Sequence, residues 1–380
     1  MSALLRITSV MLVVTHGCNL RCKYCFVRKE PERMTLETAK EAARMLMENA
    51  RVSGAAPEIN FFGGEPMLEY DTVIRPIVEW LHDELKERFR FSITTNGTLL
   101  TDERIGFMRR HGFGLLLSMD GNKPVQDYSR PYAGGGGSFE TLRPIVPKVL
   151  AAWPGTTFRM TALPETCGHT FESVLWAAAQ GFRSFFVTPD VFREWDGRAR
   201  EVLARELETY ADYYVDCKAH GVRPILFSGF EQAFEDLKQI RSAERQGTYR
   251  ALPKCTSRGK CGLGASRFAS VHPNGDVYAC QEMTSNEGPE SPFYIGSIYA
   301  GVDDARRLAL MEAFDARPVR GEDCAGCKYD RICDGGCVAN NYMLTGSLGV
   351  MPEVYCWWRR ELLSQAERIE KGVEKCRTRK

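Results

Sequence analysis

Six short β-rich runs alternate with helix-length segments between residues 5 and 187. Two of the intervening segments have helical patterns, 35–50, where Thr35 is a predicted N-cap, and 71–88. Repeated strand, helix, strand order predicts an α/β fold with a parallel sheet and right-handed crossovers. In such a sheet ligands bind at the carboxyl ends of the strands, whether it is open or curved into a partial barrel. The β-rich runs are 5–16, 58–62, 91–95, 113–118, 157–163 and 182–187.

The chain changes character near residue 255. Before that point, charged helical patterns cover 198–220 and 230–250. From 255 to 356 the sequence is rich in cysteine and glycine, as expected of a small region stabilised by metal more than by a large core. We therefore expect three parts, which are a catalytic domain at 1–230, a helical connector at 231–254 and a metal-binding domain with a C-terminal helix at 255–380.

The fourteen cysteines indicate metal binding rather than disulfides. The apolar run at 9–14 is too short to span a bilayer, and no small-residue cleavage site follows it. We therefore expect a cytoplasmic protein without membrane contact, whose thiols stay reduced. Fifty Lys and Arg residues against forty-nine Asp and Glu residues leave a net charge of +1, which gives no excess for nucleic-acid binding.

Three cysteines, Cys18, Cys22 and Cys25, form a C-x3-C-x2-C segment directly after the first predicted strand. Three thiolates leave one iron of a four-iron cluster open for a ligand, as catalytic zinc sites keep an open position. With Tyr24 before the last cysteine, the segment resembles the radical S-adenosylmethionine (SAM) superfamily, in which the open iron binds the amino and carboxylate groups of SAM. The alternative is that three unrelated thiols pack near a strand end.

Further motifs of this resemblance follow the next strands. Gly63 and Gly64 permit close approach of a ligand to the backbone, and the carboxylate of Glu65 can accept a hydrogen bond from an ammonium group. In the family this motif holds the amino group of SAM, although alone it is typical of a turn before a helix. Asn-Gly and Asp-Gly at the later strand ends are likewise ordinary turn dipeptides. The resemblance implies further SAM contacts from Tyr24, Asn96, Ser118, Asp120 and Arg130.

The cysteines from residue 255 onward resemble the SPASM extension of radical SAM enzymes, which carries two auxiliary [4Fe-4S] clusters. Each C-x2-C turn can direct two thiolates into one site. The pattern of that extension implies a first cluster on Cys255, Cys261, Cys280 and Cys337, and a second on Cys324, Cys327, Cys333 and Cys356. Thiolate-only zinc sites use similar spacings and remain an alternative. No role is assigned to Cys167, Cys217 or Cys376.

The resemblance implies a partial (β/α)6 radical SAM barrel followed by a SPASM domain, with SAM and three [4Fe-4S] clusters as cofactors. An external reductant of the flavodoxin or ferredoxin type would drive cleavage of SAM to a 5′-deoxyadenosyl radical, which takes a hydrogen atom from the substrate. Relatives with these motifs are maturases of ribosomally made peptides, which form crosslinks such as thioethers, and anaerobic sulfatase maturases. An electron-transfer protein is the rival from another class, but a relay has no use for an open iron.

One departure favours a peptide substrate. Sulfatase maturases carry an aspartate base just after the third SPASM cysteine and often a glutamine before the GGEP motif, whereas this chain has Gln281 and Phe62 there. A neutral glutamine cannot take a proton at pH 7. Glu282 is a candidate base, although an extended loop would point it elsewhere. We also expect no fused leader-binding domain, because the first strand begins near residue 5.

Overall fold

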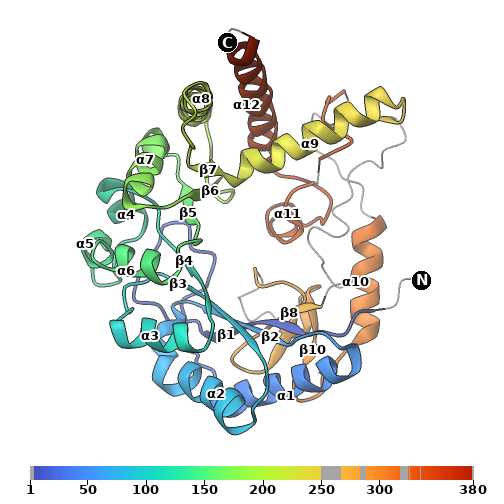
Figure 1. Ribbon diagram of the computed structural model, residues 1–380. Coiled ribbons are helices and arrows are strands. Elements are labelled where there is room, and N and C mark those ends of the chain that lie inside the picture. The colour runs from blue at the N-terminus through green and yellow to red at the C-terminus, as the bar shows by residue number, and fades with distance from the viewer. Residues whose placement is uncertain are drawn as a thin grey trace.

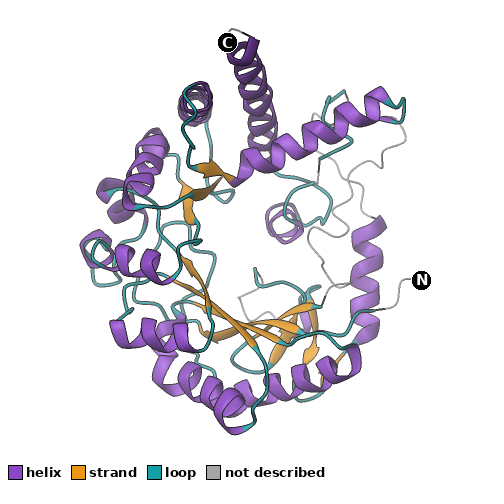
Figure 2. Ribbon diagram, viewed as in Figure 1, coloured by secondary structure: helices purple, strands orange, loops and turns teal. Residues whose placement is uncertain are grey.

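The computed structural model describes residues 4–249, 267–282, 288–316, 324, 326–333 and 335–378. Within these residues two sheets form the centre of the molecule (Figures 1 and 2). The first has the strand order β11-β10-β9-β8-β1-β2-β3-β4, and the second has the order β5-β6-β7. The strands are β1 (Ser9–Thr15), β2 (Glu58–Gly63), β3 (Arg90–Thr95), β4 (Gly114–Leu117), β5 (Phe158–Ala162), β6 (Ser184–Pro189), β7 (Leu226–Phe227), β8 (Phe268–Val271), β9 (Asp276–Tyr278), β10 (Tyr294–Ser297) and β11 (Gly301–Val302).

The six predicted strands are present, with no end more than four residues from its predicted position, and they run parallel. A parallel bridge between Ser118 and Arg159 joins the end of β4 to β5. The amide of Met119 reinforces this junction by donating a hydrogen bond to the carbonyl oxygen of Arg159 at 3.3 Å. The strands therefore form the predicted partial barrel, an arc with its carboxyl ends along one rim (Figure 1).

Helices cover the outside of the arc (Figure 2). The first, α1 (Leu36–Ser53), begins as predicted at Thr35, whose hydroxyl oxygen accepts a hydrogen bond from the amide of Thr38 at 3.0 Å. The predicted helix at 71–88 is α2 (Arg75–Glu79) with the π-helical turns η2 (Tyr70–Ile74) and η3 (Trp80–Glu84) on either side. No helix among the described residues is both long and apolar enough to cross a membrane. The others are η1 (Pro66–Glu69), α3 (Asp102–Arg110), α4 (Lys123–Ser129), α5 (Phe139–Leu142), α6 (Ile145–Ala152), η4 (Cys167–His169), α7 (Thr170–Gln180), α8 (Gly197–Ala219), α9 (Ser228–Arg245), η6 (Gly288–Glu290), α10 (Asp304–Ala316), α11 (Val338–Thr345) and α12 (Glu353–Thr378).

Alternate side chains of the barrel strands face these helices and form the core. In β2, Phe61 is fully buried and stacks on Phe91 and Phe113, with ring centroids 6.1 and 5.8 Å away. Its neighbours Asn60 and Phe62 are only partly buried and point to the opposite side of the sheet. We call this opposite side, which the arc of strands encloses, the inner face.

The C-terminal part of the chain continues the barrel sheet. Strand β8 pairs in parallel with the free edge of β1, with Ser9 opposite Phe268 and Leu12 opposite Val271. Strands β9, β10 and β11 then extend the sheet by antiparallel pairing. The predicted boundaries at 230 and 255 stay predictions, and the described part of the C-terminal region is joined to the barrel by this sheet.

Candidate active site

The loop that carries Cys18, Cys22 and Cys25 leaves the rim of the barrel where β1 ends. The end of β2 holds its first residues in place, because the amide of Gly64 donates to the carbonyl oxygen of Thr15 at 2.8 Å. The amide of Glu65 likewise donates to the carbonyl oxygen of Gly17, at 2.9 Å. The cysteine loop therefore begins in a fixed backbone arrangement.

The two glycines of the GGEP motif are required by this backbone contact. A Cβ atom on Gly63 would lie 2.1 Å from the carbonyl oxygen of Thr15, and one on Gly64 would lie 2.0 Å from that of Gly17. Gly63 also has a φ angle of 130°, which side chains disfavour. These glycines thus allow the end of β2 to pack against the cysteine loop, and their predicted contact with a ligand stays a prediction.

Glu65 is buried, with 1% of its surface exposed, and its carboxylate already has protein partners. One oxygen accepts hydrogen bonds from the Met67 amide (3.0 Å) and the Thr95 hydroxyl (2.7 Å). The other accepts from the Asn96 amide at 2.7 Å. Burial raises the pKa of Glu65, and these hydrogen bonds oppose the shift. Glu65 therefore links the ends of β2 and β3, and its predicted contact with an ammonium group stays a prediction.

We expect Glu65→Gln to destabilise the protein by about 1 to 3 kcal/mol, because the new amide nitrogen must face the backbone amide of either Met67 or Asn96. A buried donor then lacks an acceptor. Anaerobic thermal unfolding measures the effect. The matched control is Glu58→Gln at the start of β2, whose partly exposed carboxylate pairs with Arg90 and whose replacement is expected to cost less. Equal stability of Glu65→Gln and the native protein would refute the linking role.

Each sulfur of the cysteine loop has an N–H donor close by. The Lys29 ammonium lies 2.9 Å from the Cys25 sulfur, and the side-chain amide of Asn96 lies 3.9 Å from the Cys18 sulfur. The Arg130 guanidinium lies 3.9 Å from the Cys22 sulfur. Such donors stabilise thiolate ligands and tune the metal they hold.

Without a metal, two of these thiols are protonated at neutral pH. Burial raises the pKa of Cys18, and it raises the pKa of Cys22 to about 11. Cluster binding at this loop must therefore release protons.

The three sulfurs of the loop are not as close together as the ligands of one zinc ion. Thiolates on one zinc ion, at about 2.3 Å from it, lie within about 4 Å of one another. Among the described residues, no three cysteine sulfurs come within 4.8 Å of one another. Thiolates are the ligands that iron-sulfur clusters take, and the assignment of a cluster to these three cysteines stays a prediction.

A buried charged network lies beside the loop. The Tyr24 hydroxyl donates to the fully buried carboxylate of Asp120 at 2.5 Å, and the Arg130 Nε donates to the same oxygen at 2.9 Å. The Thr161 amide donates to the other oxygen at 3.0 Å. Burial opposes the charge on Arg130, but Asp120, Tyr24 and Cys22 together raise its pKa above the ordinary range. The network thus keeps a guanidinium ion beside Cys22.

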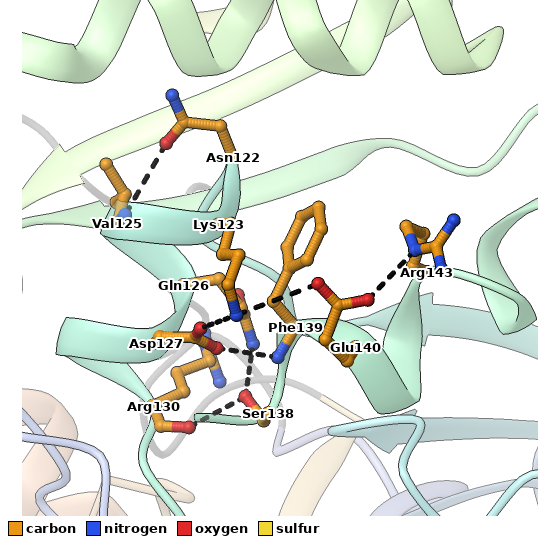
Figure 3. Close-up of polar contacts among 10 residues, drawn as sticks. All are labelled: Asn122, Lys123, Val125, Gln126, Asp127, Arg130, Ser138, Phe139, Glu140 and Arg143. Carbon is orange, nitrogen blue, oxygen red and sulfur yellow. Dashed lines mark hydrogen bonds and ion pairs between the residues drawn. The ribbon is translucent and has the colours of Figure 1, made fainter. Parts of the chain in front are cut away.

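Two further polar side chains position this network, and Figure 3 shows both of them beside Arg130. The Gln126 side chain accepts a hydrogen bond from the Asp120 amide at 2.8 Å and donates one to the Ser138 hydroxyl at 2.9 Å. Ser138 in turn donates to the carbonyl oxygen of Arg130 at 2.7 Å. Gln126 and Ser138 are both fully buried. They fix the backbone of both partners of the Asp120–Arg130 ion pair.

The structure brings the predicted SAM contacts to one rim. Asn96 follows β3, and its amide group contacts both the Cys18 sulfur and the side chain of Asn19, the latter at 2.9 Å. Ser118 follows β4, and its amide donates to the carbonyl oxygen of Thr95 at 2.9 Å. The assignment of SAM contacts to these residues stays a prediction.

Sequence reasoning missed Lys29, Gln126 and Ser138. Lys29 lies in a loop four residues after Cys25, where a basic side chain gives no distinctive signal. Gln126 lies in α4 and Ser138 directly precedes α5, and neither residue belongs to a motif. Only the folded chain brings them to the Asp120–Arg130 pair.

Three of the described C-terminal cysteines pack against two separate apolar clusters. Cys280 and Cys337 pack with the main core, and Cys337 directly precedes α11. Cys327 packs against a second apolar cluster, built from α9 and α12 with Tyr329 and Ile332. Cys324 shares a turn with Cys327, through a hydrogen bond of 3.4 Å from the Cys327 amide, and Cys356 lies in the first turn of α12. Cys333 donates its amide hydrogen to the carbonyl oxygen of Tyr329. Cys255 and Cys261 lie outside the described residues.

Comparison with known proteins gives one family match. Residues 12–175 match the Radical SAM superfamily. The serine-type anaerobic sulfatase-maturating enzyme of Klebsiella aerogenes is 24% identical over 342 residues, which cover 87% of this chain and 79% of that protein. The PqqA peptide cyclase of Rhodopseudomonas palustris is 25% identical over 362 residues, which cover 89% of this chain and 84% of that protein.

Solved structures show the same fold. The structure of anSMEcpe with bound AdoMet aligns with a TM-score of 0.72 at 18% identity, covering 97% of this chain and 95% of that chain. Streptococcus suis SuiB bound to the precursor peptide SuiA aligns with a TM-score of 0.58 at 16% identity, covering 92% of this chain and 76% of that chain.

Proposed function

Because the chain is a radical SAM enzyme, with the superfamily domain at residues 12–175, we propose that it matures a ribosomally made peptide or protein by abstracting a hydrogen atom from one of its residues. The observation that carries this proposal is the cysteine loop, in which each sulfur faces an N–H donor beside a buried Asp120–Arg130 pair. A peptide substrate is supported by three similar proteins. The two sequence relatives are named as a sulfatase-maturating enzyme and a peptide cyclase, and SuiB has a structure with a bound precursor peptide.

In this proposal Cys18, Cys22 and Cys25 hold the [4Fe-4S] cluster to which SAM binds. When bound, the two cofactors supply a radical that takes a hydrogen atom from a carbon of the substrate. The protein's share is to position the groups. Arg130, held by Asp120, offers a cation beside Cys22, and Asn96 and Ser118 offer small polar groups along the same rim. The predicted flavodoxin or ferredoxin type partner would supply the electron.

Two auxiliary [4Fe-4S] clusters complete the proposal. We assign Cys280 and Cys337, with Cys255 and Cys261, to the first. We assign the remaining SPASM cysteines to the second, and the different apolar surroundings of Cys280 and Cys327 support the division. The second group is Cys324, Cys327, Cys333 and Cys356.

Glu282 is the proposed proton acceptor. Its amide hydrogen points to the Cys280 sulfur at 3.5 Å, and this contact supports a role beside the proposed first auxiliary site. Burial raises the pKa of Glu282, and the charge of Arg159 partly opposes this shift. A carboxyl group whose pKa moves towards neutral is suited to accept a proton from a modified residue.

A crosslink such as a thioether is our preferred product, and formylglycine is the second candidate. Gln281 stands where the base of sulfatase maturases is expected, and it cannot take a proton. We therefore expect the reduced holoenzyme with SAM to leave the cysteine of a sulfatase-motif peptide unchanged. Slow cleavage of SAM without any peptide should still occur, since it does not need that base.

Mass spectrometry of the peptides distinguishes the two products. Formylglycine formation removes about 18 Da from a cysteine, and a new crosslink removes about 2 Da as two hydrogens are lost. The crosslink assay uses peptides encoded next to the gene. A loss of about 18 Da from the sulfatase peptide would establish the second candidate in place of the first. The companion variant is Gln281→Asp, which restores a carboxylate and is expected to recover at most trace formylglycine, because substrate positioning is still absent.

A further inference from the structure

The inner face of the barrel carries an arginine that no motif includes. On β5, Phe158 packs outward against Trp176 and Phe182, with ring centroids 6.4 and 5.5 Å away. Because side chains alternate along a strand, the next residue, Arg159, points to the inner face. In the described part of the chain its guanidinium stacks on the Phe186 ring, 5.1 Å from the centroid, and has no carboxylate at ion-pair distance.

Arg159 lies close to the candidate active site. It pairs with Ser118 on one side and Phe186 on the other, so these three side chains form one row across β4, β5 and β6. Two residues further along β5, the amide of Thr161 donates to Asp120. Two strand residues span about 7 Å, so Arg159 lies one step below the rim where the Asp120–Arg130 pair sits.

Arg159 is accessible from solvent and has charged groups around it. The side chain is exposed, and the neighbouring protein lowers its pKa, chiefly by burial. Glu282 raises the pKa of Arg159 and Arg130 lowers it, so both act on it electrostatically. The guanidinium remains charged at neutral pH. A cation thus faces the space below the rim, with Glu282 as the nearby opposite charge.

We propose that Arg159 binds a carboxylate of the peptide substrate and so sets which residue lies beneath the rim. This inference rests on the proposed function. The planar guanidinium can hold a carboxylate with two parallel hydrogen bonds, and Phe186 holds the guanidinium plane from one side. The carboxylate is either an acidic side chain or the C-terminus of the peptide. Arg159 is thus a specificity-determining residue.

The test uses the SAM-loaded holoenzyme and three pools of short peptides, whose other positions are randomised among residues without a carboxylate. The first pool has a central Glu, the second has a central Gln, and both are capped at each end. The third has the central Gln and a free C-terminal carboxylate. Equilibrium dialysis with mass spectrometry measures which peptides are retained. We expect a carboxylate pool to bind about tenfold better than the capped Gln pool. The pool that binds better than the capped Gln pool shows whether the bound carboxylate is a side chain or the C-terminus.

The variants separate a binding role from a structural one. Arg159→Gln should remove the preference, and Arg159→Lys should keep part of it, because the charge remains without the planar fork. The matched control is Arg143→Gln, whose native side chain pairs with Glu140 on the outer surface (Figure 3) and whose loss should leave the preference intact.

Two outcomes would overturn the inference. One is retention of peptides without any carboxylate preference, and the other is a preference that survives in Arg159→Gln. Either leaves the proposed function standing, provided that SAM-dependent mass changes occur in a peptide. Absence of such a change in every peptide would count against the proposed function itself, whatever Arg159 binds.

Discussion

Replacing Cys18, Cys22 and Cys25 together with alanine is expected to abolish SAM cleavage and to lower the iron content by about one third, since one of three proposed cubane clusters is lost. The fold should persist, because these side chains lie in a partly exposed loop and outside the buried core. Iron analysis, high-performance liquid chromatography of 5′-deoxyadenosine and circular dichroism measure the three effects.

The control for this variant is Cys376→Ala. Cys376 lies near the end of α12 and has no proposed ligand role, so iron content and SAM cleavage should match those of the native protein. If the triple variant keeps all of its iron, the first site does not hold a cluster. If it loses most of its iron, the auxiliary sites depend on the first one, and the expected loss of one third is wrong.

Replacing Asp120 with alanine is expected to destabilise the protein by about 3 to 5 kcal/mol, because the Arg130 guanidinium then remains buried without its counter-ion. For a chain of this size that corresponds to a decrease of roughly 4 to 6 °C in the unfolding temperature. The Tyr24 hydroxyl and the Thr161 amide lose their acceptor as well. Anaerobic scanning calorimetry measures the shift, and the same variant should bind SAM less tightly.

A double variant tests the cause. In Asp120→Ala with Arg130→Met, the unpaired charge is gone, so we expect part of the lost stability to return. SAM affinity should not return, since the proposed cation is missing. If the double variant is as unstable as the sum of the two single variants, then the charge pair does not explain the cost, and lost packing or lost hydrogen bonds must do so.

The elements set by local sequence could be predicted. The strands after residue 5 and the helix capped by Thr35 follow from nearby side chains, and so does the placement of Cys18, Asn96 and Ser118 at strand ends. The alternation in β5 also gave a usable signal, because it places a charged residue, Arg159, on the face opposite the buried Phe158. The predicted site residues nevertheless do not include Arg159.

The contacts between distant residues could not be predicted. Glu65 accepts a hydrogen bond from Asn96, 31 positions away, and nothing near the GGEP motif indicates that its carboxylate is occupied. The sequence likewise does not show that the backbone of the cysteine loop comes close to Gly63 and Gly64. The hydrogen-bond partners of a buried group depend on how whole strands are placed, and local patterns do not record that placement.

The pairing of β8 with β1 has a consequence for how the protein is made. The Ser270 hydroxyl donates to the carbonyl oxygen of Met11 across 259 positions of sequence. At about 5 to 20 residues per second, β8 leaves the ribosome roughly 10 to 50 seconds after β1. During that interval β1 presents one row of unpaired backbone groups to other nascent chains. Chains that stop before residue 267 keep that edge permanently, so premature termination should yield aggregates, and solubility in the cell depends on completing translation.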